Sequence, residues 1–161
     1  MKVLICGLGL IGASLAKTLK KNTTHTVLGW NRTPSVTEKA LRDGVIDRTG
    51  DIDELMSDAD ITFVNFYPDA IVPFILEHKK DSIVTDSCGI KTKICKELEH
   101  EKLNFYYVGA HPMAGREVGG YDNSQDTLFD KASFIVTPYE NTPRNKVDAL
   151  VGLAQDMKER L

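Results

Sequence analysis

The chain has 161 residues, which fits one domain of ordinary size. Apolar residues make up 42% and charged residues 27%, as in average soluble proteins, so the composition excludes collagen-like, disordered and disulfide-scaffold classes. The formal net charge of −3 leaves no excess of lysine and arginine for neutralising many phosphates, which argues against a nucleic-acid-binding protein.

Three cysteines, Cys6, Cys88 and Cys95, form no CxxC pair. A disulfide framework or a structural zinc site is therefore not expected, and the cysteine usage favours a reducing cytoplasm. The longest uncharged segment, Val3–Ala16, is too short and too rich in glycine to span a bilayer. It could pass for a secretory signal peptide, but a single lysine precedes it and regularly spaced glycines interrupt it, which favours a different interpretation.

Short apolar runs alternate with segments of helical length, and no internal repeat is present. The predicted elements, in chain order, are a strand at Val3–Cys6, a helix from about Gly12 to Lys20, a strand at His25–Trp30, a helix at Ser35–Arg42, a short strand at Val45–Ile46, a helical turn at Asp53–Ser57, a strand at Ile61–Tyr67, a helix at Ala70–Lys79, a strand at Ser82–Asp86, a helix at Lys91–His100, strands at Phe105–Ala110 and Ser133–Thr137, and a helix from Pro143 to Leu161. Strands that alternate with helices indicate right-handed βαβ units. We therefore expect an α/β fold with a Rossmann-like, doubly wound, mostly parallel sheet and helices on both faces.

A glycine-rich segment joins the first strand to the first helix. It reads Gly7-Leu8-Gly9-Leu10-Ile11-Gly12. Gly7 permits a tight turn, Gly9 lets the backbone approach a pyrophosphate, and Gly12 lets the helix pack closely on the strand. The helix N-terminus adds free N–H groups and a positive dipole. A lone GxGxxG is weak evidence, but its place within a βαβ unit favours dinucleotide binding over a packing turn.

The second strand is followed by Asn31, Arg32 and Thr33, where NAD-binding proteins carry an acidic residue that bonds the ribose 2′-hydroxyl. An uncharged amide beside a guanidinium would not repel a 2′-phosphate, and Arg32 could bind it in bidentate fashion. The three residues are therefore assigned to the cofactor site, with NADP preferred over NAD. The alternative is that Arg32 stacks on the adenine or points into solvent.

Further candidates lie at the end of the predicted strand Ile61–Tyr67 and directly after the predicted strand Ser82–Asp86. Because the carboxyl ends of parallel strands line the ligand crevice, Phe66, Tyr67, Cys88 and Gly89 are also assigned to the cofactor site. The alternative for the second segment is an ordinary strand-to-helix turn in which Asp86 or Ser87 caps the next helix. A nucleophilic role of Cys88 is not favoured, because no partner that would stabilise a thiolate is evident.

His111 is the predicted catalytic residue. It is placed at the carboxyl end of the strand Phe105–Ala110, and Pro112 restricts its backbone to extended conformations. A fixed imidazole at the crevice suits general acid–base catalysis near neutral pH, and the glycines around it allow a substrate to approach. The other histidines, His25, His78 and His100, are interpreted as polar surface residues. The segment Gly115–Asp130 has no clear element, which is typical of functional or mobile loops.

Three segments together resemble the prephenate dehydrogenase family. They are the glycine segment with its continuation to Ala16, Asp86-Ser87-Cys88-Gly89-Ile90-Lys91, and Gly109-Ala110-His111-Pro112-Met113-Ala114-Gly115-Arg116-Glu117. The resemblance covers residues 1 to about 150 and implies NAD(P)-dependent oxidative decarboxylation of prephenate to 4-hydroxyphenylpyruvate, or of arogenate to tyrosine. It implies that His111 takes the proton of the substrate ring hydroxyl. It also places Gly115 and Glu117 in the substrate pocket, with Glu117 near its entrance.

The chain departs from the family pattern at two points. Some members have a serine, bonded to the histidine, where Gly89 stands, so this contact is missing here unless Ser87 or Cys88 supplies it. The family also has a C-terminal helical domain, which completes a homodimer and supplies an arginine for the substrate carboxylate. We therefore expect residues 1–161 to form the NAD(P)-binding domain alone, incomplete for catalysis. Two rival functions are another dehydrogenase of this architecture, acting on a hydroxy acid or an imine, and a non-catalytic NAD(P)-sensing module.

Overall fold

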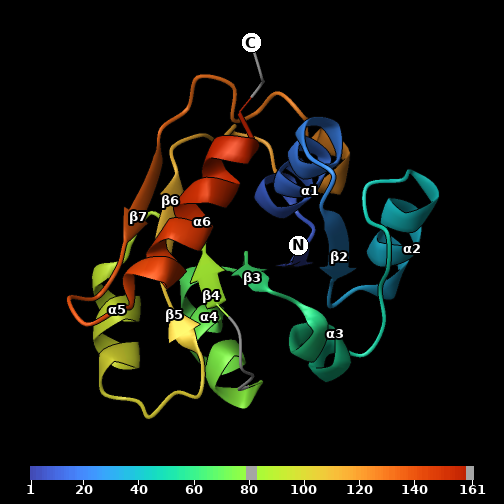
Figure 1. Cartoon of the computed structure of the whole chain (residues 1–161). Helices are drawn as coiled ribbons and strands as arrows, with labels where there is room; N and C mark the ends of the chain where they lie inside the picture. Colours follow the sequence, from blue (N-terminus) through green and yellow to red (C-terminus); the bar gives the residue numbers. More distant parts are fainter. Residues whose placement is uncertain (79–82, 159–161) are drawn as a thin grey trace.

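A five-stranded parallel sheet in the order β2-β1-β3-β4-β5 forms the centre of the computed structural model, which describes residues 1–78 and 83–158 (Figure 1). Its strands are β1 (Lys2–Cys6), β2 (Thr26–Trp30), β3 (Ile61–Val64), β4 (Ile83–Asp86) and β5 (Tyr106–Tyr107). A second, two-stranded sheet pairs β6 (Gly109–Pro112) with β7 (Phe134–Thr137) in antiparallel fashion. The expected α/β, mostly parallel sheet is confirmed.

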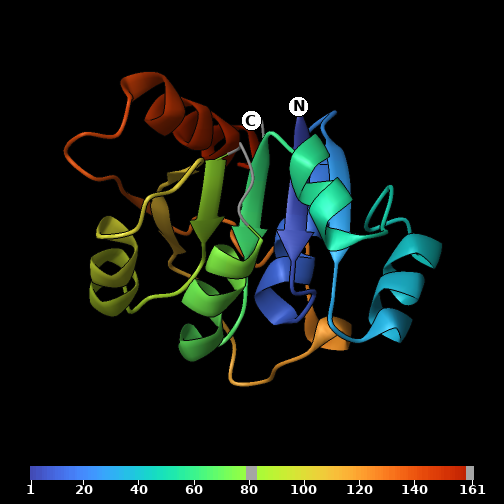
Figure 2. The same ribbon diagram turned by 90° about the horizontal axis from the view of Figure 1, so that it is seen from below.

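Helices cover both faces of the parallel sheet, as a doubly wound fold requires (Figures 1 and 2). They are α1 (Leu10–Asn22), α2 (Pro34–Arg42), α3 (Ile52–Asp58), α4 (Pro68–Glu77), α5 (Thr92–Glu99) and α6 (Arg144–Asp156), with a short 3₁₀ helix at Tyr121–Asn123. Alternate residues of β1 point to opposite faces of the sheet and pack against different helices. Val3 and Ile5 pack with α1, α2 and α6, whereas Leu4 and Cys6 pack with α3, α4 and α5. Burial on both faces explains why the strands read as continuous apolar runs.

Two predicted strands differ from the structure. Val45–Ile46 is not a strand: both residues are buried, and their N–H groups donate to the Ala40 carbonyl at the end of α2. The predicted strand Phe105–Ala110 is divided between the two sheets. The Val108 N–H still donates to the Val84 carbonyl of β4 at 3.0 Å, and from Gly109 the chain pairs with β7 instead.

This division changes the position of His111. It lies inside β6, opposite Ile135, and not after the end of a parallel strand. A side chain at Gly109 would place its Cβ 2.5 Å from Thr137 Oγ1, so glycine permits the close approach of β6 and β7. Lys79, Ser82 and the last three residues of the helix predicted to end at Leu161 lie outside the described residues.

We expect the fold to lose stability at alkaline pH. Burial raises the pKa of the Cys6 thiol from its ordinary 9.0, and burial together with the Asp86 charge raises the pKa of the Tyr107 hydroxyl from 10.0. In the unfolded chain both groups release protons at their ordinary values, while the folded protein keeps them. Above each ordinary value, the free energy of unfolding should therefore fall by about 1.4 kcal/mol per pH unit for each group.

Urea titrations at pH values below and above this range measure the effect. The Tyr107→Phe variant should lose the contribution of Tyr107 to the slope above the ordinary tyrosine pKa, while Tyr121 and Tyr139, whose pKa values burial also raises, keep theirs. Equal stability of the wild-type chain on both sides of the range would contradict the prediction.

Candidate functional site

A cavity of about 500 Å³ opens at the carboxyl ends of β1, β3 and β4. Its lining comprises Gly7, Gly9, Leu10, Ile11, Gly12, Asn31, Arg32, Asn65, Phe66, Tyr67, Pro68, Ala70, Ser87, Cys88, Gly119 and Gly120. Ten of these residues belong to the cofactor set expected from the sequence. The crevice at the carboxyl ends of the strands is where open α/β sheets bind ligands.

Two glycines of the first loop are required by backbone geometry. Gly7 has a φ of +85°, and a side chain there would place its Cβ 2.5 Å from the Asn65 carbonyl oxygen. A Cβ on Gly12 would lie 1.8 Å from the Gly7 carbonyl oxygen. Neither contact is possible for a real side chain, so Gly7 and Gly12 shape the loop and its packing against α1.

Gly9 differs, because a Cβ there would meet nothing within 4 Å. It faces open space at the start of α1. Helix α1 has no side-chain hydrogen bond at its N-cap and no acidic residue in its first turn. Its first N–H groups and the positive end of its dipole are therefore available to an anion. The space at Gly9 and these donors fit the pyrophosphate of a dinucleotide.

A matched pair of alanine variants separates the two kinds of glycine. Gly12→Ala should lower the free energy of unfolding by about 1–3 kcal/mol, because the loop must move away from the helix. Gly9→Ala should change stability little but weaken dinucleotide binding about tenfold, because the methyl group enters the space proposed for the pyrophosphate. Urea titration and calorimetry measure the two effects. If Gly9→Ala bound dinucleotide as tightly as the wild type, the ligand would lie elsewhere.

Asn31 takes part in holding the glycine loop. Its Oδ1 accepts the Leu8 N–H at 2.9 Å, and its Nδ2 donates to the Thr33 carbonyl at 3.4 Å. The Leu8 side chain is buried in the core, so Leu8 reaches this part of the site through its backbone only. Thr33 precedes α2 and is not in the cavity lining.

Arg32 is exposed, and within residues 1–78 and 83–158 it makes no hydrogen bond or ion pair. It is the one charged side chain among the described residues that line the cavity. No acidic side chain of the lining occupies the place where a ribose-binding carboxylate is expected. This end of the cavity therefore offers an unpaired guanidinium to an anion.

Aromatic residues after β3 form one wall of the cavity. The Phe66 ring packs edge-to-face on Phe74, with 4.8 Å between ring centroids, and lies 6.3 Å from Trp30. Tyr67 is 89% exposed and free to contact a ligand. Phe66 is fixed by its neighbours, whereas Tyr67 presents its ring to the mouth of the cavity.

Asp86 makes its hydrogen bonds within the protein and does not line the cavity. Its carboxylate is fully buried and accepts the Tyr107 hydroxyl at 2.8 Å, the Cys88 N–H at 3.1 Å and a hydrogen bond from the Lys91 ammonium. These bonds fix the turn after β4. A strand-to-helix turn is present and Asp86 bonds its backbone, but the predicted cap by Asp86 or Ser87 is wrong, because α5 has no side-chain hydrogen bond at its N-cap, Lys91.

His111 is half-buried beside the turn that follows β4. Its Nδ1 lies 3.3 Å from the Ser87 carbonyl oxygen. Because a carbonyl only accepts, a neutral ring carries its proton on Nδ1 and leaves Nε2 as the basic atom. A Cβ at Gly89 would lie 3.1 Å from Cε1 and 3.3 Å from Nε2 of the same ring. Gly89 therefore adjoins the imidazole, and the backbone carbonyl of Ser87 supplies the polar contact to it.

The structure does not bring every predicted site residue to the cavity. Gly115 and Glu117 are exposed in the segment after β6 and are not in the lining, which receives Gly119 and Gly120 from the same segment. Sequence reasoning missed Asn65 as a site residue. The available signal was a polar residue placed directly after a buried strand, at the edge where ligands bind.

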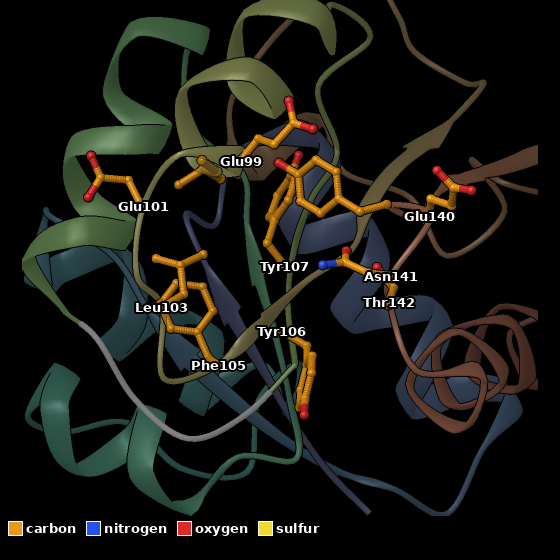
Figure 3. A pocket seen from close by; sticks show the side chains of 11 residues that line it. Glu99, Glu101, Leu103, Phe105, Tyr106, Tyr107, Glu140, Asn141 and Thr142 are labelled. Carbon is orange, nitrogen blue, oxygen red and sulfur yellow. The ribbon is translucent and has the colours of Figure 1, made fainter.

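A second cavity, of about 600 Å³, lies beside β5 and shares no residue with the first (Figure 3). Leu103, Phe105 and Tyr107 form its apolar side, and Glu99, Glu101 and Glu140 lie around it (Figure 3). It contains none of the residues assigned from the sequence. Across the described ranges, no group of three or more His, Cys, Asp or Glu could hold a metal ion. The same part of the chain has no helix long and apolar enough to cross a membrane.

Comparison with known proteins identifies related sequences. Residues 15–161 match the family model described as "Prephenate dehydrogenase, nucleotide-binding domain". The prephenate dehydrogenase of Bacillus subtilis is 30% identical over 161 residues, which cover 94% of this chain and 43% of that protein. The chain thus spans about half the length of the curated relatives it matches, since it also covers 56% of a cyclohexadienyl dehydrogenase from Zymomonas mobilis.

Solved structures of relatives have the same fold. The arogenate dehydrogenase of Synechocystis superposes with a TM-score of 0.86 at 31% identity, over 99% of this chain and 58% of that one. The prephenate dehydrogenase of A. aeolicus, in complex with hydroxyphenyl propionate and NAD+, gives a TM-score of 0.85 at 26% identity, with the same shares covered. These likenesses confirm the Rossmann-like dehydrogenase fold.

Proposed function

This chain belongs to the prephenate dehydrogenase family, and from that premise we propose that it forms the nucleotide-binding part of an NAD(P)-dependent oxidoreductase. The reaction is the oxidative decarboxylation of prephenate to 4-hydroxyphenylpyruvate, or of arogenate to tyrosine. The proposal is supported by the position of His111 next to the 500 Å³ cavity that Gly9 lines, here called the Gly9 cavity. Ser87, which contacts His111, lines the same cavity.

Each part of the cavity has a role in this proposal. The glycine loop and the N-terminus of α1 would hold the pyrophosphate, Asn31 and Arg32 would hold the ribose end, and Ser87 and Cys88 would line the part for the nicotinamide. When bound, the dinucleotide supplies a hydride acceptor. Tyr67 is an exposed residue of the lining that is free to contact the dinucleotide, and Phe66 forms a fixed apolar wall.

His111 acts as the general base. Its Nδ1–H is engaged by the Ser87 carbonyl, so Nε2 accepts the proton of the substrate ring hydroxyl. Removal of this proton lets the hydroxyl carbon become a carbonyl while that carbon gives up its hydride. Loss of carbon dioxide and aromatisation of the ring then complete the reaction. The contact between Nδ1 and the Ser87 carbonyl favours the tautomer that this step requires, which supports the proposal.

The complete enzyme, in this proposal, contains a second, helical region that follows the chain described. It supplies the group that binds the substrate carboxylate and forms a homodimer. Gly115 and Glu117, which are exposed and lie outside the cavity lining, then face the substrate between the two regions. We place the enzyme in the cytoplasm, on the basis of three cysteines that form no disulfide.

Steady-state kinetics of the complete enzyme with prephenate and arogenate, each with NAD and NADP, tests the proposed function. We expect turnover of at least one substrate, with release of carbon dioxide. Dinucleotide binding without turnover of either substrate would favour the sensing module. Turnover of a hydroxy acid or an imine instead would favour another dehydrogenase.

We predict that NADP binds more tightly than NAD. The prediction is supported by the unpaired Arg32 and by the absence of an acidic side chain from the described lining. In Arg32→Ala, NADP binding should weaken by roughly 1.5–3 kcal/mol, the range for a hydrogen bond to a charged group, while NAD binding changes little. Calorimetry measures both affinities. Arg42→Ala is a matched control, because Arg42 is an exposed arginine of α2 outside the cavity. Equal affinities for the two cofactors in the wild type would contradict the prediction.

A further inference from the structure

The side chain of Asn65 connects the ends of three strands beneath the cavity. Its Nδ2 donates to the Cys6 carbonyl at the end of β1, at 3.3 Å, and its Oδ1 accepts the Ser87 hydroxyl beyond β4, at 2.6 Å. Its own N–H donates to the same Cys6 carbonyl at 2.9 Å. Asn65 itself follows β3, so the position of its amide is determined by the parallel sheet on both sides.

Ser87 continues this connection to His111. The Ser87 hydroxyl bonds Asn65, while its carbonyl oxygen lies 3.3 Å from His111 Nδ1. A hydroxyl held at 2.6 Å restricts where the carbonyl of the same residue can lie, because the two groups are a few bonds apart. The contact to His111 is long for a hydrogen bond, so a small displacement of Ser87 would break it.

We propose that Asn65 is a positioning residue, which through Ser87 holds the carbonyl that fixes the tautomer of His111. The Asn65 amide holds the turn after β4 close to β6, so that the Ser87 carbonyl can accept a hydrogen bond from Nδ1 of His111. This leaves Nε2 free to accept a proton. The inference rests on the proposed function in one respect: the proposed function makes Nε2 the atom that accepts the substrate proton.

Nuclear magnetic resonance of the chain labelled with ¹⁵N-histidine tests the proposal without any turnover. The chain has four histidines, and the signals of His111 are assigned by their loss in His111→Asn. At a pH where the ring is neutral, we expect the wild type to show a protonated Nδ1 and a bare Nε2. Asn65→Ala should raise the proportion of the tautomer protonated on Nε2 by roughly three- to tenfold, the effect of one net hydrogen bond.

Two variants of Ser87 keep the test decisive if Asn65→Ala disturbs the glycine loop. Ser87→Ala removes the hydroxyl and keeps the carbonyl, so it should shift the tautomers as Asn65→Ala does. Ser87→Thr keeps a hydroxyl and should retain the wild-type ratio. The double variant Asn65→Ala/Ser87→Ala should shift the ratio no further than either change alone, because both break the same connection.

Thr62→Val is the matched control on the same strand. Thr62 is fully buried in β3, and its hydroxyl has no hydrogen-bond partner among the residues the structure describes. Its removal should leave the His111 tautomers unchanged. An effect of Thr62→Val equal to that of Asn65→Ala would show that any change in β3 disturbs His111, and would overturn the proposal.

Three further outcomes would overturn the positioning role of Asn65. Unchanged tautomers in Asn65→Ala and Ser87→Ala would overturn the positioning role, and so would a shift in Asn65→Ala alone or additive shifts in the double variant. Dinucleotide calorimetry on the same samples keeps the two proposals apart. Shifted tautomers in the variants, together with a wild-type chain that binds no dinucleotide, would contradict the proposed function alone, whereas dinucleotide binding by the wild type with unshifted tautomers in the variants would contradict the positioning role alone.

Discussion

Replacing His111 with asparagine should lower turnover of the complete enzyme by about 10²- to 10⁴-fold, the range for loss of a general base. Asparagine keeps a polar side chain of moderate size but cannot take up a proton. Dinucleotide affinity should stay nearly unchanged, because His111 is not in the lining of the cavity. Stopped-flow or steady-state kinetics, together with calorimetry, measures the two quantities.

The pH dependence of turnover gives an independent readout for the same variant. The dependence of turnover on pH should differ between the wild type and His111→Asn, because the variant has no imidazole that can exchange a proton with the substrate. His100→Asn is the control, since His100 lies at the end of α5 and outside the Gly9 cavity. A variant with wild-type turnover and the same dependence on pH would make His111 a structural residue.

Replacing Asp86 with alanine should lower the free energy of unfolding by about 3–5 kcal/mol, the range for removing one partner of a buried ion pair. Asp86 is fully buried, and the side chain of Lys91 is 14% exposed. The alanine variant leaves the Lys91 ammonium, the Tyr107 hydroxyl and the Cys88 N–H without their common acceptor. The Tyr107 hydroxyl would then be a buried donor without this acceptor, and the Lys91 ammonium and the Cys88 N–H would be partly buried ones.

Urea titration of Asp86→Ala beside Asp69→Ala measures this difference. Asp69 also pairs with a lysine, Lys93, at 3.1 Å, but its side chain is 91% exposed, so its removal should change stability little. Both variants remove the acid of a lysine–aspartate pair, but only Asp86 is buried and accepts further hydrogen bonds from Tyr107 and Cys88. If both variants lost the same small amount, the network around Asp86 would contribute no more than a surface pair.

His111→Asn and Asp86→Ala change side chains that contact the same turn, the one that follows β4. Asp86 fixes the start of the turn after β4, and the same turn carries Ser87 and Gly89, which contact His111. The glycine loop lies on the other side of Asn65. The proposed proton acceptor and the proposed dinucleotide site are therefore joined through short backbone segments at the ends of adjacent parallel strands.

Features that depend on local chemistry could be predicted from the order of the residues. The alternation of apolar runs with helical segments predicted the parallel strands and the helices on both faces, because burial on both sides requires such runs. The spacing of Gly7, Gly9 and Gly12 predicted the dinucleotide loop, because positive φ and close packing leave no choice of residue at two of these positions.

The way in which distant segments meet could not be predicted, because it depends on the packing of the folded chain. Phe105–Ala110 reads as one strand, but competition between β4 and β7 for its backbone hydrogen bonds divides it at Val108 and places His111 in the antiparallel pair. The roles of Asp86 and Asn65 depend on partners 21 and 22 residues away. Hydrogen bonds over such separations are set by the packing of the sheet, and no local pattern of residues encodes them.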